Sequence, residues 1–419
     1  MMTRRCFLVT TGAVTAAAGM LKAQPEGTPW YVNCYRWSQT NNTEKDGLRY
    51  DVPWWREQWK RTEVQAVVIS CMGAAISWYP TKFPLRRRNS FRPERDLFGE
   101  LVEAAQKDGI AVVARLDNGG ATEELVKAHP DWLTRTQDGQ PGTSPCVNSP
   151  YQEEYLANIF REVIERYHPV GFGDNGGVMG RSLCYCQWCS KKFRDDTGKA
   201  LPNRPDWNDP VYRQWLRWSR ARNLEVWDAN NRVTKAAGGP HCLYMGSVRK
   251  FQDYVCDIAQ RMPLLMMDSQ SRNDEGSFRE NADEARYLHS LVGWNNVIVQ
   301  SGAMYHHSHG YYRVASDPPA EARMYLKAGF AGGWSAKVHY IGAYSEDRRA
   351  YEIAPPVMQW HKKNERYLGN RTPIATAGVF RSDLNSVFYA RGAAAQLVQV
   401  SVDWQISSPH LSHTWLVQL

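Results

Sequence analysis

Beyond its N-terminal leader, the sequence lacks any apolar run of the roughly 18 residues that a membrane-spanning helix needs, which excludes a multi-spanning membrane protein. It also lacks a basic arm or stripe, because acidic and basic residues are mixed along the chain and the formal net charge is only +8. We therefore expect no nucleic-acid partner. Internal repeats and low-complexity linkers are absent too.

Apolar residues make up 43% of the chain and charged residues 22%, which suits a globular protein with a sizeable core. Aromatic residues are frequent, with 17 Trp and 21 Tyr. Such residues stack on flat ligands or sugar rings, but they also fill cores, so composition leaves both roles open.

The N-terminus carries Arg4-Arg5-Cys-Phe-Leu followed by a mildly apolar stretch, a pattern similar to a twin-arginine export signal. We expect residues 1–23 to be a cleaved signal peptide of this type, and an ordinary secretory leader or an uncleaved anchor is the alternative. The mature protein is then periplasmic or secreted, with no membrane attachment once the leader is removed. The pattern thus predicts an exported protein.

Short apolar runs alternate with amphipathic segments along residues 24–370, which predicts an α/β fold with parallel strands. Eight strands are the number that closes a (β/α)8 TIM barrel, and an open doubly wound sheet is the alternative. No Gly-x-Gly-x-x-Gly turn opens a predicted helix, which disfavours that alternative. The predicted strands are residues 30–35, 64–71, 110–116, 170–174, 242–246, 263–268, 296–301 and 336–341. The predicted helices are residues 52–62, 93–108, 151–167, 210–237, 278–292, 319–328 and 346–368.

After residue 370 the pattern breaks at Arg371-Thr-Pro, and a new strand is predicted at 374–380. The remaining stretch is too short for an independent domain. We expect residues 371–419 to be the start of a truncated second domain.

Acidic residues close several of the predicted strands: Asp117 the third, Asp174 the fourth and Asp268 the sixth, while Glu346 follows the eighth. In a (β/α)8 barrel these positions meet at the C-terminal end, and glycoside hydrolysis uses two carboxyl groups that face each other. We expect Asp174 to be the nucleophile or principal carboxylate, with Asp268 as first and Glu346 as second candidate for the acid/base. Asp117 is expected to orient a neighbour or to bind hydroxyl groups.

Amides, imidazoles and aromatic rings near the predicted strand ends suit a hydroxyl-rich ligand. The alternative for the aromatic residues is core packing, and the His306-His307 pair could instead bind a metal together with Asp268. The residues expected to bind the substrate besides Asp117 are Gln39, Asn41, Trp78, Tyr79, Asn175, His306, His307, Trp334 and His339.

The motif Cys184-Tyr-Cys186-Gln-Trp-Cys189 supplies three thiolates within one loop. Cys146 follows the neighbouring third strand and is the natural fourth ligand, so the four cysteines predict a closed, structural zinc site. A disulfide that includes Cys146 is the alternative. We expect no organic cofactor.

Asp174-Asn175 at a strand end, followed by this cysteine motif and then by Phe193 and Gly198, resembles the hypothetical glycosyl hydrolase family 6. Further similar stretches are residues 39–46, 79–84, 95–98 and 129–132, so the resemblance covers roughly residues 30–389. It implies a (β/α)8 barrel followed by a flavodoxin-like, β-galactosidase-trimerisation-like domain. Only residues 373–391 of that second domain are recognisable.

The cysteine pattern is also similar to that of glycoside hydrolase family 42 β-galactosidases, in which it holds zinc. In that family the fourth strand ends Asp-Asn-Glu with the glutamate as acid/base, whereas this chain has Asp174-Asn175-Gly176. A mechanism resembling that of α-L-fucosidases would instead use an aspartate after the fourth strand as nucleophile, which is the place of Asp174.

The sequence therefore predicts an exported glycoside hydrolase that acts on an oligo- or polysaccharide and that could form a homo-oligomer. Two alternatives remain open. One is a non-catalytic carbohydrate-binding barrel, and the other is a metal-dependent hydrolase built on His306, His307 and Asp268.

Overall fold

The computed structural model describes residues 28–371 except 74, 118–119, 175–181, 249–254, 273–275, 295, 307–312, 314 and 370, together with 378–381 and 415–418. The predicted signal peptide lies outside the described residues. No helix within the described part is long and apolar enough to span a bilayer.

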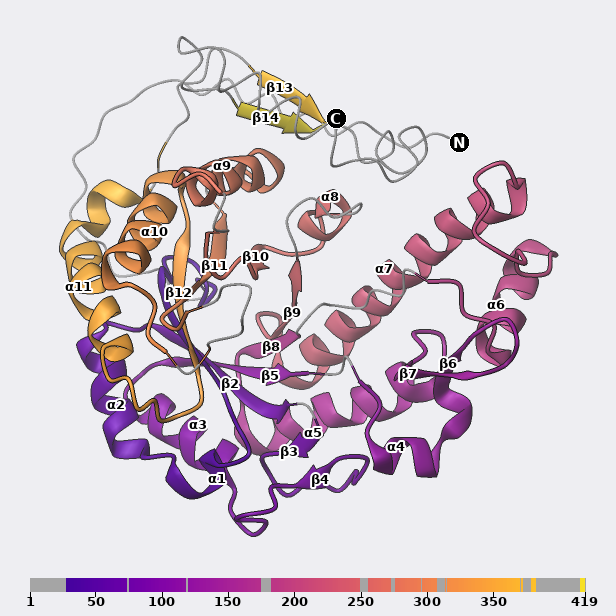
Figure 1. The fold of residues 1–419 in the computed structure, drawn as a ribbon, viewed down its shortest axis with the longest axis horizontal. Coiled ribbons are helices and arrows are strands. Elements are labelled where there is room, and N and C mark those ends of the chain that lie inside the picture. Colours follow the sequence, from indigo (N-terminus) through magenta and orange to yellow (C-terminus); the bar gives the residue numbers. More distant parts are fainter. Residues whose placement is uncertain are drawn as a thin grey trace.

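Eight parallel strands form a closed barrel at the centre of the molecule (Figure 1). Around the barrel the order is β1, β12, β11, β10, β9, β8, β5 and β2, and β2 pairs with β1 to complete the ring. This confirms the predicted (β/α)8 architecture. The strands are β1 (Arg36–Asn41), β2 (Ala66–Gly73), β5 (Ala111–Leu116), β8 (Gly171–Asp174), β9 (Leu243–Val248), β10 (Leu264–Met267), β11 (Val297–Ala303) and β12 (Ser335–Ile341).

Helices surround the barrel, as expected for strands whose apolar outer faces must be covered (Figure 1). They are α1 (Asp46–Arg49), α2 (Val52–Arg61), α3 (Leu97–Lys107), η2 (Tyr151–Leu156), α5 (Ala157–Tyr167), α7 (Pro210–Gly238), α8 (Val255–Ala259), α9 (Glu280–Val292), α10 (Pro319–Gly332) and α11 (Ala350–Leu368). Short strands β3 (Ile76–Ser77) and β4 (Arg87–Arg88) extend the sheet beyond β2. The last barrel helix begins at Ala350, four residues later than predicted.

The first predicted strand, residues 30–35, is wrong: the strand is β1, and the apolar run before it forms turns at the N-terminal end of the barrel. Trp30 donates from Nε1 to the carbonyl of His241 at 2.9 Å, and its ring lies 5.6 Å from that of the fully buried Trp37. Asn33 has a φ of 68°, which a strand cannot accommodate. The run therefore covers the N-terminal end of the barrel. As a consequence, Gln39 and Asn41 lie within the first strand rather than after it.

Strand register decides which side chains face the barrel lumen, since neighbouring parallel strands place paired residues on the same face. Lys337 of β12 pairs with Ser301 of β11, and His339 pairs with Gln39 of β1. The residues that alternate with them point outward: Tyr340, which follows His339, lies 5.3 Å, ring to ring, from Trp55 of α2. Lys337, His339, Gln39 and Ser301 thus face the lumen.

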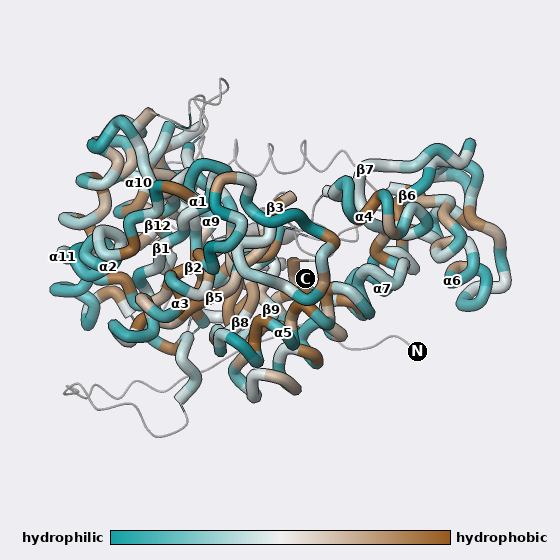
Figure 2. The backbone as a smooth tube through the Cα atoms, turned by 90° about the horizontal axis from the view of Figure 1, so that it is seen from below, coloured by the Kyte–Doolittle hydropathy of each residue, from teal (hydrophilic) through white to brown (hydrophobic). Residues whose placement is uncertain are grey.

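A lobe projects from one side of the barrel (Figure 2). It comprises α4 (Glu123–Ala128), η1 (Pro130–Trp132), β6 (Leu133–Arg135), β7 (Pro141–Pro145), α6 (Gln187–Thr197) and the first half of α7. With 29 residues, α7 is about 43 Å long, so it links the lobe to the barrel wall.

In the C-terminal segment, β13 (Gly378–Arg381) pairs in parallel with β14 (Trp415–Gln418), which contacts α9. A parallel pair agrees with an α/β unit, but most of residues 371–419 lie outside the described residues. The flavodoxin-like domain therefore stays a prediction.

Candidate functional site

Asp268 lies in the lumen at the C-terminal end of β10. It comes one residue after Met267, which pairs with Gln300, so Asp268 is level with Ser301 and shares its lumen face. Its Oδ1 accepts a 3.0 Å hydrogen bond from Gln270 Nε2. Burial alone would raise the pKa of Asp268, but the nearby Lys337 and the hydrogen bonds from Gln270 and Ser301 lower it overall. Asp268 is therefore a carboxylate at neutral pH.

Lys337 and His339 face Asp268 from β12, and both are almost fully buried. Burial lowers the pKa of Lys337 to about 8, with Asp268 opposing that shift and Arg115 adding to it. Burial likewise lowers the pKa of His339 to about 3, so this imidazole is neutral in the physiological range. Lys337 is thus the group that supplies positive charge next to Asp268.

Polar side chains connect Asp268 to the first strand. The hydroxyl of Tyr305 donates to Gln270 Oε1 and lies 3.5 Å from His339 Nδ1. The other ring nitrogen of His339 is 3.2 Å from Gln39 Nε2, which donates to Asn41 Oδ1 at 2.7 Å. We call Gln39, Asn41, Asp268, Gln270, Tyr305, Lys337 and His339 the lumen network.

Asp117 extends β5 by one residue, because its backbone N–H donates to the carbonyl of Met72 at 3.0 Å. It therefore keeps the lumen face of Arg115, whose Nη2 lies 3.6 Å from Asp117 Oδ2. Trp78 borders the same place: a Cβ on Gly73 would lie 3.8 Å from Trp78 Nε1 and 4.0 Å from Arg115 Nη1. The structure thus brings Asp117 and Trp78 to one side of the lumen. Asn175 lies outside the described residues.

Asp174 does not face the lumen, contrary to the prediction that made it the principal carboxylate. It pairs with Leu116 across from β5, and the residue before it pairs with the lumen-facing Arg115, so Asp174 lies on the outer face of the wall. Its Oδ2 accepts a 2.7 Å hydrogen bond from Tyr244, whose ring packs against Trp227 of α7. Asp174 is 2% exposed in this layer between barrel and helices.

The prediction that Tyr79 binds the substrate is also wrong. It is fully buried outside the barrel, where its hydroxyl donates to Glu162 Oε2 at 2.9 Å and its ring packs against Phe98 and Tyr167. The alternative of core packing holds for this residue.

Trp334 was predicted to bind the substrate, but it lies at the opposite end of the barrel from the strand ends where the site was expected. It precedes β12, so it belongs to the N-terminal end of the barrel, where its Nε1 donates to the carbonyl of Asn281. There it lines a cavity of about 260 Å³ together with Tyr35, His289, Trp294, His361 and Glu365. A residue that precedes a strand reaches the end opposite to one that follows it.

Glu346 lies in the exposed loop between β12 and α11, and none of the described hydrogen bonds or ion pairs joins it to Asp268. The position of Glu346 therefore does not support its predicted role as the acid/base.

His306 follows β11, and its Nδ1 is 3.4 Å from Asp317 Oδ1. Burial raises the pKa of Asp317 to about 6. His307 lies outside the described residues.

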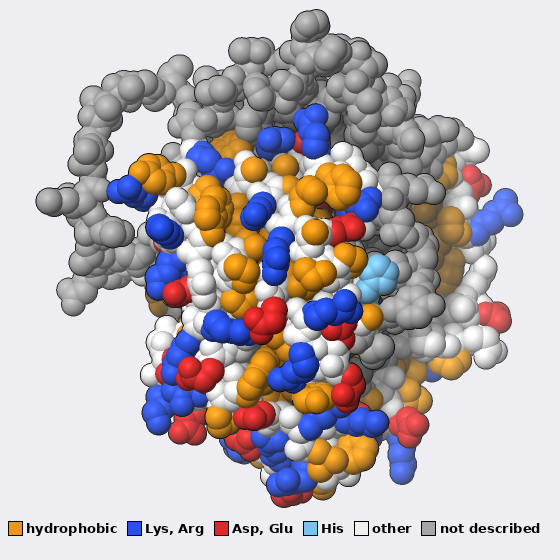
Figure 3. Space-filling model, turned by 60° about the vertical axis from the view of Figure 1, so that its left-hand side comes forward, with side chains coloured by type: hydrophobic (Ala, Val, Ile, Leu, Met, Phe, Trp, Pro, Cys, Tyr) orange, Lys and Arg blue, Asp and Glu red, His pale blue; other side chains and the backbone are white. Residues whose placement is uncertain are grey.

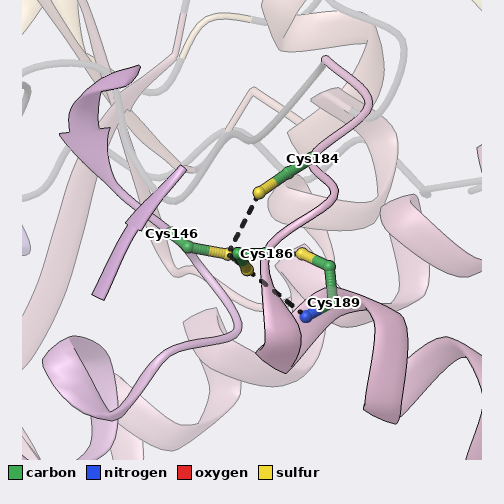
Figure 4. A group of neighbouring side chains, drawn as sticks. All are labelled: Cys146, Cys184, Cys186 and Cys189. Atoms are coloured by element: carbon green, nitrogen blue, oxygen red, sulfur yellow. Dashed lines mark hydrogen bonds between the residues drawn. The ribbon is translucent and has the colours of Figure 1, made fainter. Parts of the chain in front are cut away.

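Four buried cysteines converge in the lobe, and their sulfur atoms all lie within 4.8 Å of one another (Figure 4). Cys146 follows the end of β7, Cys184 lies between β8 and α6, Cys186 is the N-cap of α6, and Cys189 lies in the first turn of that helix. The sulfur of Cys146 is 3.3, 3.5 and 3.9 Å from those of Cys189, Cys186 and Cys184. A tetrahedral zinc site with Zn–S bonds near 2.3 Å has S–S edges of about 3.8 Å, so the four thiols fit zinc.

Hydrogen-bond donors surround these sulfurs. The backbone N–H groups of Arg135, Asn148 and Cys189 each lie 3.4 Å from a cysteine sulfur. Such donors stabilise thiolates. The disulfide alternative is wrong for these residues, since all four cysteines are free and their sulfurs are far beyond the bonding distance of about 2.05 Å. Among the described residues, this is the only cluster suited to a metal ion.

The sequence interpretation missed Arg115, Gln270, Tyr305 and Lys337. A signal was present for two of them: Lys337 and His339 alternate within an apolar strand, and Arg115 interrupts another. A charged residue at an alternate position of a buried strand has to point into the lumen or against a partner, because burial without one is too costly.

Comparisons with known proteins agree with this architecture. Residues 55–173 match the family model of hypothetical glycosyl hydrolase 6. Over 170 residues the chain is 28% identical to β-galactosidase BgaH of Haloferax lucentense, a match that covers 36% of this chain and 25% of that protein.

Solved structures share the fold. The α-L-fucosidase isoenzyme 2 from Paenibacillus thiaminolyticus superposes with a TM-score of 0.68 at 17% identity, covering 83% of this chain and 52% of that one. A glycoside hydrolase family 42 β-galactosidase from G. stearothermophilus gives 0.65 at 14% identity, covering 93% and 66%. The chain thus spans between a quarter and two thirds of these relatives. The matches confirm the resemblance: the chain is similar to the hypothetical glycosyl hydrolase 6 family over residues 55–173, and its fold is similar to that of a glycoside hydrolase family 42 β-galactosidase.

Proposed function

We propose that the protein is an exported glycoside hydrolase that cleaves an O-glycosidic bond of an oligo- or polysaccharide. The observation that carries this proposal is the position of Asp268 at the C-terminal end of the barrel, among the amides, imidazole and hydroxyl of the lumen network. Active sites of (β/α)8 enzymes lie at this end. The family match and the glycosidases that share the fold support the same activity.

The second carboxylate of our proposal is Asp117 rather than Asp174. It shares the lumen with Asp268 by register, and it stays partly open to solvent, with 29% of its side chain exposed. A pair of carboxylates can divide the work of general acid and of nucleophile or base. Arg115, beside Asp117, would orient it.

The test is the substitution Asp268→Asn, which preserves size but removes the charge. Turnover of a cleaved aryl glycoside should fall by at least about 1,000-fold without loss of folding, because the carboxylate acts on the transition state. The matched control is Asp195→Asn on α6, where the aspartate forms only an exposed pair with Lys191. Near-normal turnover in the Asp268 variant contradicts the assignment.

A non-catalytic sugar-binding barrel is the second candidate. The position of Asp174 outside the lumen favours it, since one of the predicted catalytic acids is removed from the site. It predicts glycan binding in calorimetry with no hydrolysis of any aryl glycoside, and with binding retained in the Asp268→Asn variant.

For the lobe we propose a structural zinc ion held by Cys146, Cys184, Cys186 and Cys189. Four thiolates leave no open position for water, so the ion would fold the lobe and take no part in turnover. A twin-arginine route, which carries folded proteins, would allow the metal to be bound before export.

A further inference from the structure

The cavity at the N-terminal end of the barrel, away from the lumen network, has walls that come from separate parts of the chain. Its volume of about 260 Å³ lies just below the roughly 300–1,000 Å³ that is usual for small-molecule sites. Much of its wall is aromatic, with the rings of Tyr35, Trp294, Phe330 and Trp334. Such rings pack against flat, apolar groups. The size and lining of the cavity therefore suit a small planar molecule.

His361 of α11 carries a buried hydrogen-bond donor for which the described residues supply no acceptor. The side chain lines the cavity, is 3% exposed, and has its ring centroid 4.3 Å from that of Phe330. Its Nδ1 lies 3.2 Å from Nη1 of Arg36, and because a guanidinium can only donate, Nδ1 is the acceptor. Burial and the charges of Arg36 and Arg371 lower the pKa of His361 to about 4, so the ring is neutral and its proton is on Nε2. This N–H is left to donate to an occupant of the cavity.

Arg371 also lines the cavity, and it is a half-buried guanidinium to which no described acid is paired. Its Nη1 donates to the carbonyl of Ala331 at 3.0 Å. Burial and the charge of Arg286 lower the pKa of Arg371, and no carboxylate opposes this shift. The charge of Arg371 acts on the imidazoles of both His289 and His361. The guanidinium therefore lies near the donor of His361.

The other ionisable groups of the wall are already engaged. Glu365 does not balance Arg371, because its Oε2 accepts from Arg36 at 2.5 Å. Both ring nitrogens of His289 lie against backbone carbonyls, at 3.1 and 3.0 Å. Arg371 and the Nε2–H of His361 thus offer donors, one set of them cationic, that the described acceptors leave unmatched. A carboxylate matches them, since it accepts charge-assisted hydrogen bonds and fits the flat fork of a guanidinium.

We propose that this cavity is a second ligand site, which binds a small aromatic carboxylate through Arg371 and the Nε2–H of His361. The carboxylate accepts from the guanidinium and the imidazole, and the ring of the ligand packs against the aromatic side chains of the wall. The site is at the opposite end of the barrel from Asp268, so it does not depend on the proposed glycosidase activity.

The test is calorimetric titration of the full chain with benzoate, 4-hydroxybenzoate and 4-hydroxycinnamate, each compared with its neutral amide. We expect at least one acid to bind at least about tenfold more tightly than its amide, the effect of one hydrogen bond to a charged group. Arg371→Gln should remove this preference. Arg366→Gln, which removes an exposed arginine from the last turn of α11, is the matched control and should keep it. Asp268→Asn should keep it too.

Equal affinity for acids and amides, no measurable binding of any of them, or an unchanged preference in Arg371→Gln would overturn the proposal. Loss of binding in Asp268→Asn would do so as well, because the ligand would then lie in the lumen. Tighter binding of inorganic phosphate or of cyclohexanecarboxylate would overturn the ligand class. His361→Phe keeps a flat ring but removes the donor, and it should weaken binding of the acid. Should that variant not fold, Arg371→Gln, at a half-buried position, still decides.

Discussion

Asp174 and Asp268 both end a barrel strand, yet their side chains lie on opposite faces of the barrel wall. The difference is the register of one residue, since each step along a strand moves a side chain to the other face. In its position under α7, Asp174 contributes to stability through the hydrogen bond from Tyr244.

We therefore expect Asp174→Ala to destabilise the protein by about 1–3 kcal/mol, because the buried hydroxyl of Tyr244 loses its acceptor. The value of kcat/KM should change by less than about threefold, far below the effect of Asp268→Asn. Urea unfolding and kinetics on the same preparation measure both. Tyr244→Phe is the matched control, and the double variant should be less destabilised than the sum of the singles. A large loss of turnover in a folded Asp174→Ala protein would restore the original assignment.

Lys337 predicts a dependence of stability on pH. Its pKa is about 8 in the folded protein and 10.5 without burial. Between these two pKa values Lys337 is protonated in the unfolded chain and neutral in the folded protein. The free energy of unfolding therefore rises with pH from about 8 to 10.5, and this gain is absent below pH 8. The difference in unfolding free energy between Lys337→Met and the wild type should shift by up to roughly 3 kcal/mol across this window. Denaturation midpoints at pH 7.5 and 10 test this, and a constant difference would contradict it.

At the scale of elements, the cysteine cluster joins the end of β7 to the start of α6, with Trp188 and Leu201 packed against it, while Phe193, Tyr212 and Trp215 form a separate apolar cluster in the lobe. We expect Cys186→Ser to lower the melting temperature and to release bound zinc, since the free energy of metal binding is part of folding. Elemental analysis and thermal denaturation measure the two effects. Cys256→Ser on α8, a cysteine outside the cluster, is the control and should keep the metal. Folded wild-type protein that contains no zinc would remove the metal assignment.

Most strands and helices could be predicted from the sequence, because buried parallel strands are continuous apolar runs and the helices between them are amphipathic. The prediction of the first strand was wrong because the apolar run at Trp30 packs against the N-terminal end of the barrel. Its side chains make tertiary contacts there, and its backbone does not pair as a strand. The prediction for Trp334 was wrong for a related reason. Its aromatic ring suggested stacking on a sugar, but its position before β12 places it at the N-terminal end of the barrel.

For the molecule as a whole, the closed barrel explains why the site was predicted only in part. The acids at strand ends could be identified, but whether each faces the lumen depends on pairings between distant strands that local sequence does not encode. The mixed surface charge was predictable from composition: acidic and basic side chains are interspersed over the face that carries α10 and α11 (Figure 3).

Closure of the barrel depends on β1, which pairs with both β12 and β2. The first residue of β1, Arg36, forms an ion pair with the last barrel helix, α11. Arg36 donates to Glu365 Oε2 of α11 at 2.5 Å and to the carbonyl of Glu63 at 2.8 Å, and its side chain is only 5% exposed. Glu365→Gln leaves this cation buried with less compensation, so we expect a loss of about 1–3 kcal/mol in unfolding free energy. Glu352→Gln, which breaks the solvent-exposed pair with Arg61, is the control and should cost less than about 0.5 kcal/mol. Urea denaturation of both variants tests the ranking. Equal effects would mean that the buried pair contributes no more to barrel closure than a surface pair does.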